Sequence, residues 1–320
     1  MGFWSRRLDS GEADREHAAM RELEARLLVD CHNLLGECVL WNPRDERVYW
    51  SDVYGQKLYC CDADGQQLVV RELPDKLGSF AFDLDGNLLA AFAKGLYRYQ
   101  LATGRAEQLT HFEPQLAPTR LNDGRTDRGG RFVVGGCHQG FYNPVSSVIS
   151  YTGGNTARTL IEGVALTNGI AFSLDGTRMY FSDSETYVYH WYEYDPRSGQ
   201  LGARHVLTEL TRGQGFADGS CVDADDQLWN ARYYGGLVQQ YRPDGSEALR
   251  VRLPTLCPTC VCFGGPALDT LFITTGSKDL NDEQRRAQPG AGGLFVVKPG
   301  VKGVPEPRFA GRLFAHPKGE

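Results

Sequence analysis

Short stretches of alternating hydrophobic and polar residues cover most of the chain, and they are joined by tight polar turns. One unit reads GSFAFDLDGNLLAAF, and similar units read NGIAFSLDGTRMYFSDS and DGSCVDADDQLWNARYY. The aromatic and β-branched residues favour strands, and Asp-Gly or Asp-Asp pairs tolerate the positive φ angles of two-residue hairpin turns. The pattern predicts a succession of β-hairpins. Short helices are expected only in the N-terminal tail and in DLNDEQRRA, residues 279–287.

The hairpin recurs six times, and a second hairpin follows each copy, the last being GLFVVKPGVKGVPEPRFAG. The first-hairpin turns are 41 to 50 residues apart and are marked by Asp45, Gly86, Gly129, Gly176, Asp226 and Asp269. Four strands in about 40 to 50 residues is the period of a β-propeller blade. A sandwich of unrelated hairpins would require this pattern to arise six times by chance.

We therefore predict an all-β fold, a six-bladed β-propeller of four-stranded blades that forms one closed domain over residues 21–320. Residues 1–20 are expected to be a flexible N-terminal tail. The segment RELEARLLVD, residues 21–30, is expected to add a strand to the last blade and so close the ring.

Charge and composition narrow the class of partner. The chain has 34 Lys and Arg against 40 Asp and Glu, a net charge of −6, which disfavours nucleic acid as a partner. No apolar run is long enough to span a bilayer, so no membrane association is expected. The N-terminus lacks the apolar segment of a secretory signal, which predicts a cytoplasmic location. The nine cysteines are then expected to be reduced, without disulfides.

The first strand of each propeller blade lines the central channel, so residues at the start of these strands gather at one mouth. Seven to nine residues before the turn markers stand Glu37, Gly78, Asn122, Asn168, Asp218 and Cys260. Glu37, Asn168 and Asp218 offer hard oxygen donors, and Asn122 could add another directly or through water. This donor set suits Ca²⁺, Mg²⁺ or Mn²⁺, with Zn²⁺ or Fe²⁺ also possible.

Each Asn-Gly or Asp-Gly pair also has a simpler interpretation as a turn former. Glu37 does not, because Gly-Glu-Cys-Val is no turn signal. A carboxylate that opens an apolar strand is costly unless it is paired or bound to a metal.

Two further side chains are candidates for substrate binding. Arg120 is two residues before Asn122 and so lies on the same face of an extended segment. Its guanidinium suits a carboxylate or the oxygens of a polyol, and its alternative is a solvated loop arginine. His138, in GGCHQGFYNP, follows the second strand of the third blade and could overhang the mouth.

Other motifs carry less chemistry. Cys257, Cys260 and Cys262 resemble half of a zinc site, but no second cluster accompanies them, so small core residues are the favoured interpretation. The sequence contains no GxSxG elbow, P-loop or dinucleotide-binding fingerprint. Serine-hydrolase, NTPase and Rossmann functions therefore have no support.

Several ordered motifs resemble one family. LLGECVLWNP, TRLNDGRTDRGGRF, LTNGIAFSLDG, YFSDS, ADGSCVDADDQLWNA and PGAGGLF, spread over roughly residues 30–311, are similar to gluconolactonases, senescence marker protein (regucalcin) and related bacterial sugar lactonases. LGSFAF and TRLNDGR are similar to bacterial pentonolactonases such as L-arabinonolactonase. The resemblance implies a six-bladed propeller that holds one divalent metal at the channel mouth and hydrolyses lactones of aldonic acids.

By motif, the family's metal ligands fall on Glu37, Asn168 and Asp218, and its substrate contacts fall on Arg120 and Asn122. There is one departure. Family members commonly carry an acidic substrate contact after the third blade, where this chain has Gly-Cys-His-Gln-Gly at 136–140. The resemblance therefore leaves the identity of the sugar open.

We expect metal-dependent hydrolysis of a small sugar lactone to its aldonic acid, with Asp218 acting as general base as well as metal ligand. Three alternatives stay open. The same residues could bind calcium without turnover, the propeller could be a protein-interaction scaffold, or the metal could serve an esterase or phosphotriesterase.

Overall fold

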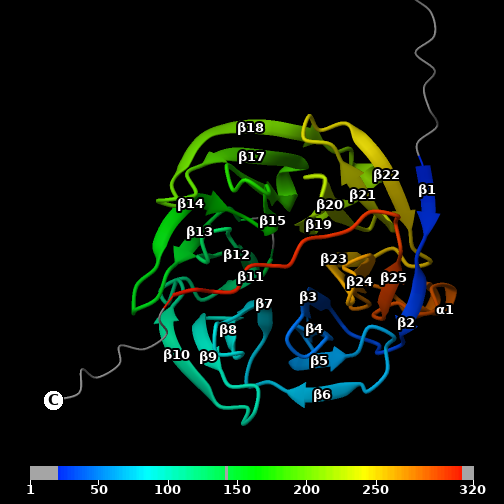
Figure 1. The fold of residues 1–320 in the computed structure, drawn as a ribbon, viewed down its shortest axis with the longest axis horizontal. Coiled ribbons are helices and arrows are strands. Elements are labelled where there is room, and N and C mark those ends of the chain that lie inside the picture. The colour runs from blue at the N-terminus through cyan, green and yellow to red at the C-terminus, as the bar shows by residue number, and fades with distance from the viewer. Residues whose placement is uncertain (1–20, 141–142, 312–320) are drawn as a thin grey trace, which may run out of the picture.

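The computed structural model describes residues 21–140 and 143–311. In this part of the chain, six β-sheets stand as blades around a central axis (Figure 1). Consecutive strands of a blade are antiparallel, and the innermost strand of each blade contacts the innermost strand of the next all the way round the ring. The prediction of a six-bladed all-β propeller is confirmed. The predicted tail, residues 1–20, and the last residues of the predicted domain lie outside the described residues.

The strands follow the chain from the channel outward in each blade. The first blade has β3 (Gly36–Asn42), β4 (Arg47–Asp52), β5 (Lys57–Cys61) and β6 (Val69–Glu72), and the second has β7 (Leu77–Phe82), β8 (Leu88–Phe92), β9 (Gly95–Tyr99) and β10 (Ala106–His111). The third has β11 (Thr119–Thr126), β12 (Phe132–His138), β13 (Ser146–Tyr151) and β14 (Arg158–Val164). The fourth has β15 (Thr167–Phe172), β16 (Arg178–Asp183), β17 (Val188–Tyr194) and β18 (Leu201–Glu209). The fifth has β19 (Phe216–Val222), β20 (Leu228–Tyr233), β21 (Leu237–Tyr241) and β22 (Glu247–Arg252), and the sixth has β23 (Pro258–Gly264), β24 (Thr270–Thr275) and β25 (Leu294–Val297).

The N-terminal segment closes the ring across two blades. β2 (Arg26–Val29) pairs with β25 as the outer strand of the sixth blade, which confirms the predicted closure. β1 (Arg21–Glu24) pairs in parallel with β22, so the fifth blade has a fifth strand that the sequence pattern did not predict. These pairings cover the outer edges of both blades, which would otherwise present unpaired backbone groups.

The sixth blade corrects one prediction. The second hairpin expected in GLFVVKPGVKGVPEPRFAG contributes only β25, and residues 298–311 run across the channel instead (the red segment in Figure 1). Prolines at 299, 305 and 307 have no N–H to donate, so this segment cannot complete a strand ladder. It bonds instead to the hairpin turns, with Gly303 N donating to Leu268 O (2.8 Å) and Phe309 N to Phe82 O (2.8 Å).

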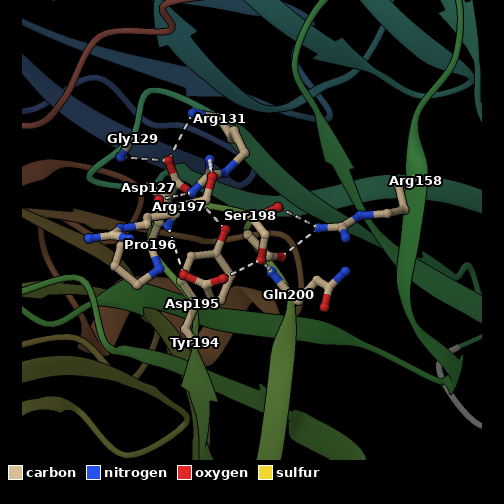
Figure 2. A network of polar contacts seen from close by, with 11 residues as sticks. Asp127, Gly129, Arg131, Arg158, Tyr194, Asp195, Pro196, Arg197, Ser198 and Gln200 are labelled. Atoms are coloured by element: carbon tan, nitrogen blue, oxygen red, sulfur yellow. Dashed lines mark hydrogen bonds and ion pairs between the residues drawn. The ribbon is translucent and has the colours of Figure 1, made fainter.

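Polar side chains reinforce the junction between the third and fourth blades (Figure 2). The buried carboxylate of Asp127, in the β11–β12 turn, accepts from Arg131 Nε (2.7 Å) and from Tyr194 Oη (2.6 Å). Arg131 in turn donates to the Arg197 carbonyl in the β17–β18 turn (3.0 Å). Two hairpin turns far apart in the sequence are thereby fixed against each other.

The structure also bears on the predicted short helix, the cysteines and the possibility of a membrane-spanning helix. The helix expected at 279–287 is present as α1 (Asp282–Ala287). All nine cysteines are free, and Cys257, Cys260 and Cys262 are buried among core residues, as predicted. Among the helices of the described residues, none is both long and apolar enough to cross a membrane.

Candidate active site

Each of the six inner strands carries a β-bulge at the same level of the channel. The pairing of inner and second strands slips by one residue between Glu37/Leu40, Leu77/Ser79, Leu121/Gly124, Asn168/Ala171, Ala217/Ser220 and Pro258/Cys260. A bulge inserts one extra residue and re-aims the neighbouring side chains. The six bulges therefore form a ring of redirected side chains at the mouth where the inner strands begin.

The predicted positions lie in or beside these bulges. Glu37 precedes Cys38, which has φ 48°, and Asn168 precedes Gly169, which has φ 68°. Positive φ is easy for glycine and rare for cysteine, so both bulges are pronounced. In the sixth blade the extra residue is Thr259, one residue before the Cys260 that the repeat counting selected.

A cavity of about 360 Å³ opens over this ring, a size that suits a small molecule. Five of the six predicted site residues line it: Glu37, Arg120, Asn122, Asn168 and Asp218. His138 is not among the lining residues. It ends β12, and its Nδ1 accepts from the Gly140 N–H (3.1 Å).

The remaining lining residues were missed. Leu35, Leu166 and Phe216 form an apolar wall, and each stands two residues before a predicted ligand, as Arg120 stands before Asn122. The same two-residue offset that pointed to Arg120 could have found them. The cavity is also lined by Tyr233, at the end of β20, and by Tyr234, Glu185, Lys278 and Asp279, which follow the second strands of their blades.

A chain of hydrogen bonds fixes the amide side chains of the ring. Arg120 Nη1 donates to Asn122 Oδ1 (2.8 Å), and Asn122 Nδ2 donates to Asn168 Oδ1 (3.1 Å) and to the Thr167 carbonyl (2.8 Å). Asn168 Nδ2 donates a hydrogen bond to Ser184 Oγ (2.9 Å), and the Ser184 hydroxyl donates in turn to Ala217 O (2.7 Å). Because the Ser184 proton is engaged by Ala217, Ser184 is left to accept, and this directs Asn168 Oδ1 toward the channel.

This orientation brings two acceptors together. Asn168 Oδ1 lies 3.0 Å from Asp218 Oδ1 and 2.9 Å from Thr167 O. If the amide turned over, its nitrogen would donate to both oxygens, but Ser184 would have to redirect its proton away from Ala217. Either a proton donor or a cation must face Asp218 Oδ1 here. The donor set, all oxygen and partly anionic, fits a hard divalent cation.

Without such a cation, burial and the neighbouring negative charges disfavour the ionised forms of the Glu37 and Asp218 carboxylates. Burial, and next the charge of Asp123, raise the pKa of Glu37 to about 8, although Arg120 lowers it. Burial, and next the charge of Glu37, raise the pKa of Asp218 well above its usual range. A bound divalent cation would supply the missing positive charge and favour both ionised forms. The residues that would hold it are Glu37, Asn168 and Asp218.

Asp123 is a functional candidate that sequence reasoning passed over as part of a turn. Its buried carboxylate accepts from the N–H groups of Gly124 (2.8 Å) and Ile170 (3.0 Å). Ile170 belongs to the bulge that follows Asn168, so Asp123 ties the β11 and β15 bulges together. Below it, the Arg125 guanidinium fills the channel and donates to Ser220 O (3.1 Å) and Val261 O (2.9 Å).

Comparison with known proteins identifies relatives of this chain. A family model described as the SMP-30/Gluconolactonase/LRE-like region matches residues 35–277. An L-arabinolactonase of Azospirillum brasilense is 38% identical over 293 residues, covering 90% of this chain and 96% of the relative. A 6-deoxy-6-sulfogluconolactonase of Pseudomonas putida is 33% identical over 280 residues, covering 87% and 96%.

Among solved structures, the crystal structure of a calcium-binding protein, regucalcin, from Agrobacterium tumefaciens superposes with a TM-score of 0.86. It is 29% identical in sequence, and the match covers 90% of this chain and 98% of that chain. The likeness therefore extends over the whole ring of blades, including the inner strands that carry the bulges.

Proposed function

This chain belongs to the SMP-30/Gluconolactonase/LRE-like family, and we propose on that premise that it hydrolyses an aldonolactone to the aldonic acid with the help of one divalent metal ion. Glu37, Asn168 and Asp218 would hold the metal. The observation that carries the proposal is the convergence of the buried Glu37 and Asp218 carboxylates and the Asn168 amide in the lining of one small-molecule cavity. Relatives named as lactonases of five- and six-carbon sugars support the class of substrate.

A divalent cation in this position supplies Lewis-acid polarisation of a carbonyl oxygen and lowers the pKa of water. The residues of the chain account for the rest. Asp218 lies at the floor of the cavity and takes a proton from the attacking water. The water oxygen bonds to the lactone carbonyl carbon, the ring C–O bond breaks, and the ring oxygen leaves as a hydroxyl by taking the proton that Asp218 accepted. The resulting carboxylic acid ionises near neutral pH and releases one proton.

Arg120 and Asn122 would orient the sugar and stabilise negative charge on the carbonyl oxygen. Arg120 is almost completely buried, and its Nε has no hydrogen-bond partner in the described part of the chain. A buried, unsatisfied donor beside a substrate cavity is costly unless a ligand engages it. The apolar wall of Leu35, Leu166 and Phe216 would pack against the sugar carbons and exclude water.

Proton release on a panel of pentono- and hexonolactones tests this proposal. Chelator-stripped protein is assayed alone and after addition of Ca²⁺, Mg²⁺, Mn²⁺, Zn²⁺ or Fe²⁺. We expect metal-restored hydrolysis, and the ranking of lactones identifies the sugar. Asp218→Ala should lower both metal occupancy and kcat by orders of magnitude, and Arg120→Ala should weaken substrate use while metal stays bound. Wild-type turnover in Asp218→Ala would overturn the assignment.

A second candidate, metal binding without turnover, is favoured by the structural match to a protein described as calcium-binding. The same panel separates the two. Bound metal with no hydrolysis of any lactone would support the binding protein.

A further inference from the structure

A short 3-10 helix, η1 (Ser184–Thr186), lies at the channel mouth directly after β16 and carries Glu185 into the lining of the cavity. The helix is anchored on both sides. Ser184 bonds to Asn168 and to Ala217, next to Asp218. The Asp183 carboxylate accepts from the N–H groups of Ala165 (2.9 Å) and Leu166 (3.1 Å). The backbone of Glu185 is therefore fixed relative to the metal-ligating strands.

The carboxylate of Glu185 differs from the other three that line the cavity. Asp279 accepts from Lys278 Nζ (2.6 Å) and Tyr233 Oη (2.9 Å). Glu37 and Asp218 form the proposed metal site. In the described ranges, the Glu185 side chain has neither a hydrogen bond nor an ion pair, although it is partly buried. Its desolvation is uncompensated within the protein, and burial raises its pKa.

A carboxylate has two oxygens and can accept hydrogen bonds from two neighbouring hydroxyls at once. A sugar lactone bound over the metal site presents such hydroxyls to the cavity wall. A lactone with its own carboxylate on that side would meet a like charge in a partly desolvated place. The cavity wall at Glu185 thus favours a neutral hydroxylated lactone over a lactone that carries a carboxylate.

We propose that Glu185 is a specificity-determining residue that accepts hydrogen bonds from substrate hydroxyls and selects neutral polyhydroxylated lactones over anionic ones. The proposal rests on the lactonase function proposed above. It makes the fourth blade contribute substrate recognition through η1, in addition to metal ligation through Asn168.

The test compares variants on three lactones that differ in the groups they can present to Glu185. These are L-arabinono-1,4-lactone, γ-butyrolactone, which has no hydroxyls, and D-glucaro-1,4-lactone, which carries a carboxylate. In Glu185→Ala, kcat/KM for the arabinonolactone should fall about 10- to 100-fold, the range for a charge-assisted hydrogen bond. The value for γ-butyrolactone should stay within about twofold. In Glu185→Gln, kcat/KM for the glucarolactone should rise.

Glu209→Ala, which removes an exposed carboxylate from β18 of the same blade, is the matched control and should change none of these values. Calorimetric binding of the corresponding arabinonolactam to stripped protein gives a second readout that needs no turnover, and Glu185→Ala should weaken it. Equal losses on the hydroxylated and unsubstituted lactones, or no loss at all, would overturn the role of Glu185 alone. Absence of hydrolysis by the wild type would instead overturn the lactonase function.

Discussion

At the scale of single residues, the orientation of the Asn168 amide determines whether oxygen or nitrogen faces Asp218 at the channel mouth. Asn168 can present oxygen or nitrogen to Asp218, and Ser184 biases the choice because its proton is committed to Ala217. Asn122 adds a second bias by donating to Asn168 Oδ1. The neighbours Ser184 and Asn122 thus influence which atom of the Asn168 amide faces Asp218.

Ser184→Ala tests this role. Without the hydroxyl, the amide is free to turn its nitrogen toward Asp218, so metal affinity should fall about tenfold, the worth of one buried hydrogen bond. Isothermal titration of stripped protein measures the effect. Ser173→Ala, a buried serine in the turn of the same blade, should leave affinity unchanged. Equal metal affinity in Ser184→Ala and wild type would show that the amide orientation is set elsewhere.

The pKa of Glu37 predicts how metal-free protein responds to pH. Burial raises that pKa from its ordinary 4.5 to about 8, so the folded state holds its proton to higher pH than the unfolded state does. Stability of stripped protein should therefore fall as pH rises from about 5 to 8. Saturating metal should abolish the fall, because it stabilises the ionised carboxylates.

Thermal melts across this pH range, with chelator and with metal, measure the response. Glu37→Gln should flatten the metal-free curve, since the amide does not titrate. A wild-type melting temperature that rises with pH in chelator would contradict the assigned direction.

The repeat in the sequence carried enough information to predict which residues meet at the channel mouth, while their roles stay predictions. Glu37, Asn122, Asn168 and Asp218 occupy equivalent positions in different blades, and all line the cavity. Glu185 and the other lining residues beyond the second strands were missed, because the repeat was used only to compare the starts of the inner strands. His138 was selected for its place after the second strand of the third blade, outside the repeat comparison, and it does not line the cavity.

At the scale of elements, the bulges in the inner strands bring the candidate site residues together at the channel mouth. An unbroken strand would point alternate side chains into the blade interfaces, whereas the extra residue redirects them toward the mouth. Hairpin turns leave clear sequence signals, and these predicted the strands. The bulge at Cys38 has a positive φ angle without a glycine, so the sequence carries no signal for it, and the bulges were not predicted.

Gly169→Ala tests the bulge in β15. Gly169 has φ 68°, and an added Cβ would lie 2.7 Å from the Tyr189 hydroxyl oxygen. Backbone strain of roughly 1–2 kcal/mol and this clash should displace Asn168 and lower metal affinity at least tenfold. Gly176→Ala is the control, since Gly176 has φ 71° but lies in the β15–β16 turn away from the cavity. Comparable metal affinities in the two variants would contradict a role for the bulge.

At the scale of the whole molecule, both ends of the described chain close the ring. The N-terminal strands join the fifth and sixth blades, and residues 298–311 cross the channel to reach the second and third. The sequence predicted the pairing of β2 because a propeller needs a closing strand. It did not predict the crossing segment, whose partners are up to 266 residues away and leave no local pattern.

Phe309→Ala tests the contribution of this crossing. Phe309 is fully buried and stacks on Tyr151 with ring centroids 5.6 Å apart. Its loss should lower the free energy of unfolding by about 3–5 kcal/mol, as for other buried aromatic side chains. Denaturant melts of metal-free protein measure the change. Phe309→Leu should lose less, and a loss below about 1 kcal/mol for alanine would show that the segment is dispensable for stability.

The most direct measurement of the central claim is a titration of the preferred divalent metal into chelator-stripped protein, with binding heat and lactone hydrolysis followed on the same sample. The account predicts that hydrolysis is absent at first, rises in proportion to bound metal and reaches its limit at one metal per chain. Full hydrolysis by the stripped protein, or saturation with one metal and no hydrolysis of any lactone, would contradict it.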